Sequence, residues 1–183
     1  MKSISFTILL LFLSCNTQNQ QKTIDEQLYT YDVEEKISEL NIELPETTKP
    51  VANYLHAVKT GNLVFMAGKG PRTSEGTLVT GKIGTDLTVD QGYEAARLVA
   101  IAQLSVLKEQ IGDLNNVEQI VKVLGMVNAS VEFTDHPEVI NGFSDLMVEV
   151  FGERGKHARA AVGMASLPRN IACEIEMIVK VKE

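Results

Sequence analysis

Hydrophobic residues recur along the chain at two different spacings, and each spacing predicts one kind of element. Helical spacing occurs over three segments, which are residues 24–44, 88–111 and 135–152. Thr88 with Gln91, and Asp135 with Glu138, have the spacing of capping boxes at the starts of the second and third segments. These patterns predict three helices, of which the first ends before Pro45.

Runs of apolar residues, several of them alternating with polar ones, predict strands. They cover residues 54–58, 63–67, 78–82 and 120–130, and two further strands lie within residues 156–181. A turn at Gly61 predicts that the first two strands form a β-hairpin, and Gly125 predicts a bulge in the long strand. We expect the last two strands to form a second hairpin across residues 166–170. The order of elements predicts an α+β domain in which two helices cover one face of a mixed sheet.

Charged residues interrupt the alternation in the last two predicted strands. Side chains on a strand alternate between its faces. His157 and Arg159 therefore share one face, while Glu174 and Glu176 point away from the apolar face of the final strand. We expect these charges to lie together on the side of the sheet away from the core. An ion pair on the surface would contribute about 0–1 kcal/mol. Alternatively, the small residues around Arg159 leave space for its guanidinium to hold a carboxylate ligand through two hydrogen bonds.

Composition narrows the classes of function. The chain has 183 residues, of which 44% are hydrophobic, and these values fit one globular domain. Its formal net charge is −7, and it has no basic cluster interleaved with aromatic residues, which argues against a nucleic-acid partner. His56, His136 and His157 are not grouped at the spacing of metal ligands, so we expect no metal site. Cys173 lies among apolar residues and is expected in the core.

The N-terminus has the features of an export signal. A lysine, an apolar run and a small residue precede Cys15, and the run is too short to span a bilayer. This pattern predicts a lipoprotein-type signal peptide over residues 1–15 with Cys15 as the lipidated residue; an ordinary cleaved signal and an uncleaved one are the alternatives. A lipid anchor would hold the exported protein at a membrane surface, facing the periplasm or the cell exterior. Residues 16–50 then form a polar tether and the first helix, and residues 51–183 form the main domain.

Three stretches of sequence resemble one known family. They are YLHAVKTGNLVFMAGKGP, INGFSDLMVEVFGERG and, most specifically, ARAAVGMASLPRNIACEIEMI. In this order, from about Pro50 to Val181, they resemble the Rid family of YjgF-like reactive intermediate deaminases, and in particular its longer-chain branch of unassigned function. The resemblance implies a chorismate-mutase-like fold, a homotrimer with clefts between its subunits, and no cofactor.

The resemblance also implies roles for individual residues. Arg159 would clamp the carboxylate of a 2-imino or enamine acid, and Glu174 would position the attacking water and exchange protons. Tyr54 and Asn141 would complete the pocket from their respective subunits. Hydrolysis of an imine needs a fixed substrate, a placed water and a proton for the departing ammonia, so an arginine and a glutamate suit this chemistry.

Some features depart from the deaminating members of that family. Ala67 stands where those members often have a serine or threonine, and Ala161 stands where many have a cysteine. The resemblance implies substrates released by cytosolic enzymes, whereas the signal predicts export. Three functions therefore stay open: an imine or enamine deaminase, a trimeric envelope protein that binds small carboxylates without turning them over, and a ribonuclease, which the acidic charge disfavours.

Overall fold

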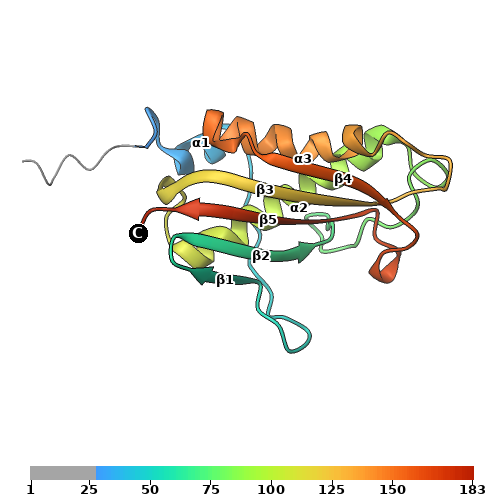
Figure 1. Cartoon of the computed structure of the whole chain (residues 1–183), viewed down its shortest axis with the longest axis horizontal. Coiled ribbons are helices and arrows are strands. Elements are labelled where there is room, and N and C mark those ends of the chain that lie inside the picture. The colour runs from blue at the N-terminus through green and yellow to red at the C-terminus, as the bar shows by residue number, and fades with distance from the viewer. Residues whose placement is uncertain (1–27) are drawn as a thin grey trace, which may run out of the picture.

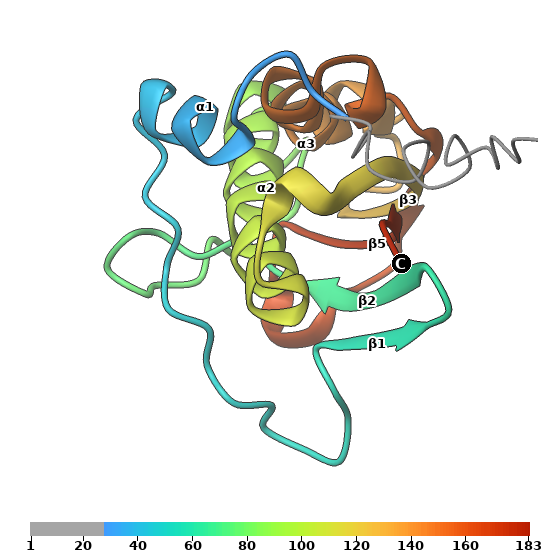
Figure 2. The ribbon, with the colours of Figure 1, turned by 90° about the vertical axis from the view of Figure 1, so that its left-hand side faces the viewer.

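A mixed five-stranded sheet carries helices on one of its faces. The structure is a computed structural model and describes residues 28–183. Its strands are β1 (Ala57–Thr60), β2 (Leu63–Lys69), β3 (Val117–Asn128), β4 (Ala158–Met164) and β5 (Cys173–Val181), in the sheet order β1-β2-β5-β3-β4 (Figure 1). Its helices are α1 (Val33–Glu39), α2 (Val89–Ile111) and α3 (His136–Phe151), and its short 3-10 turns are η1 (Leu114–Asn116), η2 (Gly152–Gly155) and η3 (Pro168–Asn170). The two long helices, α2 and α3, lie on the same side of the sheet (Figure 2), so the predicted α+β architecture is confirmed.

The two long helices begin in different ways. Thr88 has the extended conformation of an N-cap, with ψ of 168°, and exchanges hydrogen bonds with Gln91 in both directions, which confirms the capping box of α2. Asp135 stands at the N-cap of α3, but its ψ of 37° is not extended, and its side chain makes no capping hydrogen bond. The capping box predicted with Glu138 is therefore wrong, although the start of the helix is where the sequence placed it.

One core lies between the sheet and the helices. Val123 of β3 faces Met177 of β5 in register, and both side chains are buried. The apolar stripe predicted for the third helix is buried as well; it consists of Val139, Phe143, Leu146 and Val150. Gln103 of α2 donates hydrogen bonds to the carbonyls of Ala67 (3.0 Å) and Ile175 (2.8 Å). These bonds hold β2 and β5 at the point where the ladder between the two strands is interrupted.

The last two strands do not form the predicted hairpin. β3 lies between them, because β4 pairs with β3 in parallel and β5 pairs with β2 and β3 in antiparallel. β3, α3 and β4 thus form a β-α-β unit, the usual connection between adjacent parallel strands. The chain between β4 and β5 passes the end of β3, where the Asn128 amide donates to the Ala172 carbonyl at 3.0 Å. An alternating pattern identifies a strand but not its neighbour in the sheet, and for this reason the prediction was wrong.

Two predictions for the other strands also need correction. Residues 78–82 contribute only isolated bridges and no strand of their own. Gly125 pairs regularly with Ile175, and the irregular register of β3 lies between residues 117 and 122. A Cβ added to Gly125 would lie 2.6 Å from Cδ1 of Ile140 in α3. Close approach of the helix, and not a bulge, therefore explains this glycine.

The first hairpin is confirmed, with Thr60 paired to Leu63 across a turn in which Gly61 has a φ of 55°. β1 begins at Ala57, so Tyr54 precedes the strand in which the sequence placed it. The first helix is shorter than predicted. α1 ends at Glu39, and the residues that follow, up to position 44, are not helical.

The segment before β1 packs against the same core as the rest of the structure. The Tyr29 hydroxyl donates to the Val117 carbonyl at 2.6 Å, and Nε of Arg154 donates to the Leu28 carbonyl at 2.9 Å. The predicted signal peptide with Cys15 and the start of the predicted tether lie outside the described residues. Within residues 28–183, no helix is long and apolar enough to cross a membrane.

Candidate functional site

Arg159 lies on β4, an edge strand of the sheet, and points toward the helix layer. Its neighbour in the parallel register is Val123, a fully buried core residue, so the two side chains share the helix-covered face. Nη1 of Arg159 donates to Oδ1 of Asn141 at 2.9 Å and to Oγ of Ser144 at 3.0 Å. Asn141 in turn donates from Nδ2 to Glu138 at 3.0 Å. One face of α3 thus fixes the position of the guanidinium.

Ser144 also contacts a histidine on the same strand as Arg159. Its Oγ lies 3.0 Å from Nε2 of His157, and Nδ1 of His157 lies 2.7 Å from the carbonyl oxygen of Gly155. Burial lowers the pKa of His157, the Gly155 carbonyl raises it, and the nearby Arg159 lowers it further. Sequence reasoning missed Ser144 and His157 as parts of this site. The available signal was that His157 shares a strand face with Arg159, and that Ser144 follows Asn141 by one helical turn.

Several N–H groups of the Arg159 guanidinium donate no hydrogen bond to residues 28–183. Within residues 28–183 the guanidinium forms no ion pair, and only its Nη1 donates a hydrogen bond to the protein. The neighbouring positions on β4 are small; they are Ala158, Ala160, Ala161 and Gly163. A half-buried arginine without a carboxylate partner, next to small side chains, is suited to binding an anion.

Glu174 lies on β5 and points to the opposite, open face of the sheet. It is opposite Met126 of β3, while its neighbours along the strand, Cys173 and Ile175, are buried in the core. A Cβ added to Gly68 of β2 would lie 3.0 Å from Cγ and Cδ of Glu174 and closer still to Oε1. The carboxyl group therefore lies directly against the backbone of β2. Burial, and secondly the charge of Glu176, raise the pKa of Glu174.

The four residues that the sequence assigned to one pocket do not meet within one chain. Arg159 and Asn141 are hydrogen-bonded, but Glu174 lies on the other face of the sheet, so the expectation that Arg159 and the glutamates lie together is wrong for the single chain. That expectation assumed that β4 and β5 pair in a hairpin. In the structure β3 lies between them, and the side chains of Arg159 and Glu174 point to opposite faces of the sheet. β1 and β4 are the two edge strands, separated by four inter-strand spacings of about 4.8 Å, or about 19 Å. Tyr54, which precedes β1 and is 47% exposed, lies beyond the far edge from Arg159.

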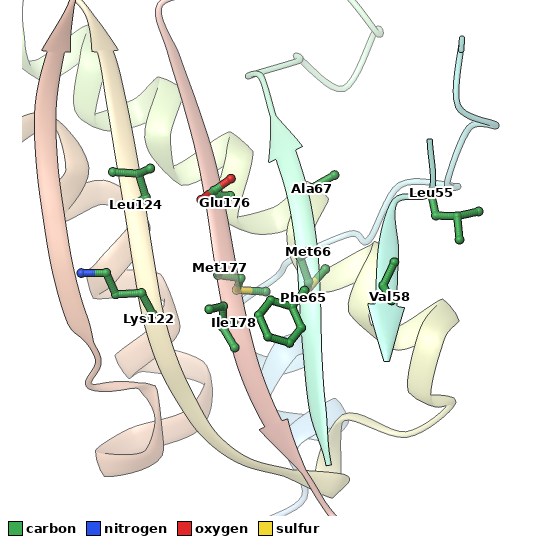
Figure 3. A pocket seen from close by; sticks show the side chains of 10 residues that line it. All are labelled: Leu55, Val58, Phe65, Met66, Ala67, Lys122, Leu124, Glu176, Met177 and Ile178. Atoms are coloured by element: carbon green, nitrogen blue, oxygen red, sulfur yellow. The ribbon is translucent and has the colours of Figure 1, made fainter. Parts of the chain in front are cut away.

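The open face of the sheet carries a hollow with apolar walls. Its volume is about 280 Å³, and Glu176 and Lys122 add a charge of each sign to its lining. Figure 3 looks onto this face and shows the apolar side chains that surround the hollow; they include Leu55, Val58, Phe65, Leu124 and Ile178. Val58 is 51% exposed and Phe65 is 43% exposed. Exposed apolar side chains that gather on one face mark a surface suited to another protein surface.

No metal site was predicted, and among residues 28–183 no group of three or more His, Cys, Asp or Glu side chains is arranged to hold a metal ion. Cys173 is buried in the core, as predicted, and burial raises the pKa of its thiol to about 12. The thiol is therefore protonated at neutral pH and is not suited to act as a nucleophile.

A sequence model of the family described as "YjgF/chorismate mutase-like, putative endoribonuclease" matches residues 34–181. The chain belongs to this family. A crystal structure of a protein of unknown function from Agrobacterium tumefaciens is 41% identical, with a TM-score of 0.75, and the match covers 82% of this chain and 94% of that one.

Two curated relatives extend the comparison. Protein TCP17 of Trypanosoma cruzi is 40% identical over 145 residues, which are 79% of this chain and 91% of that protein. A 2-iminobutanoate/2-iminopropanoate deaminase of Dermatophagoides farinae is 30% identical over 143 residues, which are 77% of this chain and 95% of that protein. The resemblance to YjgF-like Rid proteins read from the sequence is thereby confirmed, and so is the fold that it implied.

Proposed function

We propose that the chain hydrolyses small 2-imino or enamine carboxylates to 2-keto acids and ammonia, in sites built where two copies meet. The observation that supports this most is the Arg159 guanidinium, which α3 orients through Asn141 and Ser144 and which no carboxylate of the described residues neutralises. A group held in this way selects an anionic ligand. The name of the Dermatophagoides farinae relative, a 2-iminobutanoate/2-iminopropanoate deaminase, supports an imine as the reacting group.

The proposed reaction consumes one water. The water oxygen adds to the carbon of the C=N bond while Glu174 takes a proton from the water and passes it to the nitrogen, which gives a carbinolamine. Glu174 then takes the proton of the new hydroxyl and passes it to the nitrogen, the C–N bond breaks, the nitrogen leaves as ammonia, and the C=O bond of the keto acid forms. Glu174 suits this exchange because burial and Glu176 raise its pKa, which makes its carboxylate more basic than that of a solvated glutamate.

The site needs more than one copy of the chain because its parts lie on different faces. Arg159 and Asn141 stand at the edge formed by β4 and α3, whereas Glu174 stands on the open face of the sheet. We propose that this open face, with Phe65, Leu124 and other exposed apolar side chains, packs against further copies in a homotrimer. The edge of one copy would then supply the guanidinium, and its neighbour would supply Glu174 and Tyr54.

The decisive experiment measures deaminase activity on the purified full chain. 2-Iminopropanoate is generated in the assay by an amino acid oxidase, and semicarbazide traps it faster than it traps the keto acid, so an active deaminase lowers the initial rate of semicarbazone formation. We expect wild type to lower this rate and Arg159→Ala to lose about 100-fold in kcat/KM, because the carboxylate is no longer held. Arg97→Ala is the matched control, since Arg97 is paired with Glu149 on the surface of the helices, at 2.9 Å.

The outcomes separate the proposal from its alternatives. A wild-type chain that leaves the initial rate of semicarbazone formation at its value without protein contradicts the proposal. Equal activity of Arg159→Ala and Arg97→Ala would contradict the role of Arg159, even if the chain is a deaminase.

A second candidate function is binding of small carboxylates without turnover. It is favoured by Ala67 and Ala161, which stand where the resemblance implies a serine or threonine and a cysteine in many deaminating members. It is also favoured because Asn141 and Ser144 of the same chain already hold the Arg159 guanidinium. Pyruvate should then raise the melting temperature of wild type, but not that of Arg159→Ala, in a chain that shows no turnover. If pyruvate leaves the melting temperature of wild type unchanged, this second function is contradicted.

The place of action is also a proposal. We propose that Cys15 carries a lipid that holds the exported protein at a membrane surface, so that its ligands come from outside the cytoplasm. Metabolic labelling with a radioactive fatty acid tests this, because wild type should carry label and Cys15→Ser should carry none. Wild type that carries no label contradicts the proposal that Cys15 is lipidated.

A further inference from the structure

We infer that Ser144 and His157 are positioning residues that set which edge of the Arg159 guanidinium is offered to a ligand. The inference rests on the proposed role of Arg159 as an anion clamp. A chain of hydrogen bonds, here called the relay, runs from Arg159 through the Ser144 hydroxyl to the His157 ring and ends on the Gly155 carbonyl.

The direction of every bond in this chain follows from its ends. A carbonyl oxygen only accepts, so Nδ1 of His157 carries the hydrogen that it shares with Gly155 at 2.7 Å. In a neutral ring Nε2 then has a lone pair, and it accepts from the Ser144 hydroxyl at 3.0 Å. With its own hydrogen committed, the Ser144 oxygen accepts from Nη1 of Arg159 at 3.0 Å. Burial favours the neutral ring because it lowers the pKa of His157.

The second acceptor completes the constraint on the guanidinium. Nη1 carries two hydrogens, and Asn141 and Ser144 provide its two acceptors, at 2.9 and 3.0 Å. The donors that remain are the Nε–H and the two hydrogens of Nη2. Nε and Nη2 lie on one edge of the guanidinium and form a fork that matches the two oxygens of a carboxylate. The structure therefore assigns this edge, and not the Nη1–Nη2 end, to the ligand.

The ring of His157 is itself held in place. It sits edge-on to the ring of Phe143, with centroids 6.4 Å apart, and Phe143 is fully buried in α3. Gly155, which accepts from His157, is also buried, and a Cβ there would meet the backbone of Met147. The Gly155 end of the relay thus lies in the packed core, so that the orientation of Arg159 does not depend on the ligand.

Nitrogen-15 NMR of the histidine rings in the ligand-free protein shows which ring nitrogen of His157 carries the hydrogen. We expect His157 to be a neutral ring with its hydrogen on Nδ1, and we assign its signals from their loss in His157→Asn. Free neutral histidine prefers the other tautomer, so a hydrogen on Nε2 of His157 overturns the relay. This measurement needs neither a ligand nor turnover, and its result is therefore independent of whether the chain is a deaminase.

The functional arm compares three serine variants of the full chain. Ser144→Ala removes the acceptor for Nη1, and we expect pyruvate to bind about threefold to tenfold more weakly, as for the loss of one hydrogen bond. Ser144→Thr keeps the hydroxyl and should restore most of the affinity. Ser105→Ala is the matched control, because the Ser105 hydroxyl donates only to the Ile101 carbonyl in its own helix, α2.

The pyruvate affinities of these variants test whether the Ser144 hydroxyl positions Arg159. Equal affinity of Ser144→Ala and wild type, with equal melting temperatures, overturns the positioning role while leaving the anion clamp intact. If Ser144→Thr binds as weakly as Ser144→Ala, the hydroxyl is not the group that matters, and the inference also fails. A wild type that binds pyruvate without deaminating an imine contradicts the proposed reaction but not the relay.

Discussion

Replacing Gly68 by alanine tests whether the carboxyl group of Glu174 must stand where the structure has it. An added Cβ would lie 3.0 Å from Cγ and Cδ of Glu174 and closer to Oε1, whereas ordinary contacts begin at 3.4 Å. The carboxyl oxygen must therefore retreat by about 1 Å, and a misplacement of that size costs about 100-fold in rate at a catalytic group. The atoms that yield belong to the end of a flexible side chain, so the fold should lose little stability.

The assay is the competition between the full chain and semicarbazide for 2-iminopropanoate, together with a melting curve for each variant. We expect Gly68→Ala to lower kcat about 100-fold, with a melting temperature close to that of wild type. The pKa of Glu174, followed by carbon-13 NMR of its carboxyl, should fall back toward its usual range because the group moves toward solvent. Gly70→Ala is the matched control, since the atoms nearest to its added Cβ belong to the side chain of Ile171.

Two results would refute this reasoning. The first is a Gly68→Ala variant that keeps the wild-type kcat although the carbon-13 signal of the Glu174 carboxyl has shifted. This result would show that catalysis does not need the carboxyl group at its observed position. A large fall in the melting temperature of Gly68→Ala shows instead that the packing of β2 on β5, and not a catalytic position, requires the glycine.

Two further predictions concern stability. Burial and Glu176 raise the folded-state pKa of Glu174 above its unfolded value, so its ionisation weakens the fold as pH rises from the unfolded pKa through the folded one. Glu174→Gln should therefore melt at a higher temperature than wild type at pH 7, with no difference below about pH 4, and equal melting at both pH values would contradict the burial of this carboxyl. A Cβ added to Gly142 would lie 2.8 Å from the carbonyl carbon of Tyr93, and because backbone does not yield, Gly142→Ala should lose about 3 kcal/mol in denaturant unfolding. An unchanged midpoint would show that α2 and α3 are free to separate.

The two long helices were predictable because their signals are local. The apolar stripe of α3 and the Thr88 capping box of α2 are set by residues within a few positions of one another, and both are present in the structure. The pairing of β4 and β5 was not predictable in this way. Each strand has an alternating pattern that fits several neighbours, and the choice depends on how α3 carries the chain from β3 to β4.

The same limit explains what the sequence revealed of the site. Alternation places Glu174 away from the apolar face of its strand, where the structure also has it, but for Arg159 and His157 it does not say whether the helices cover their shared face. That depends on the parallel register, in which Arg159 lies beside the buried Val123. Ser144 was hidden for a related reason, because a serine beside an apolar stripe has no pattern that marks it as a partner of an arginine.

The division of the candidate site between two faces links assembly to chemistry in the proposed function. The helices α2 and α3 cover one face of the sheet (Figure 2), and Arg159 points to that face. A ligand can therefore reach its guanidinium only at the exposed edge strand β4. The carboxyl of Glu174 is reachable only from the other face, which is apolar where Phe65 and Leu124 stand. No side-chain rotation brings the two groups together across the sheet, whereas the edge of one copy can meet the open face of another. If the reaction needs both groups, the isolated chain is therefore able to anchor an anion but not to hydrolyse it, and every change that separates the copies should abolish turnover before it abolishes binding.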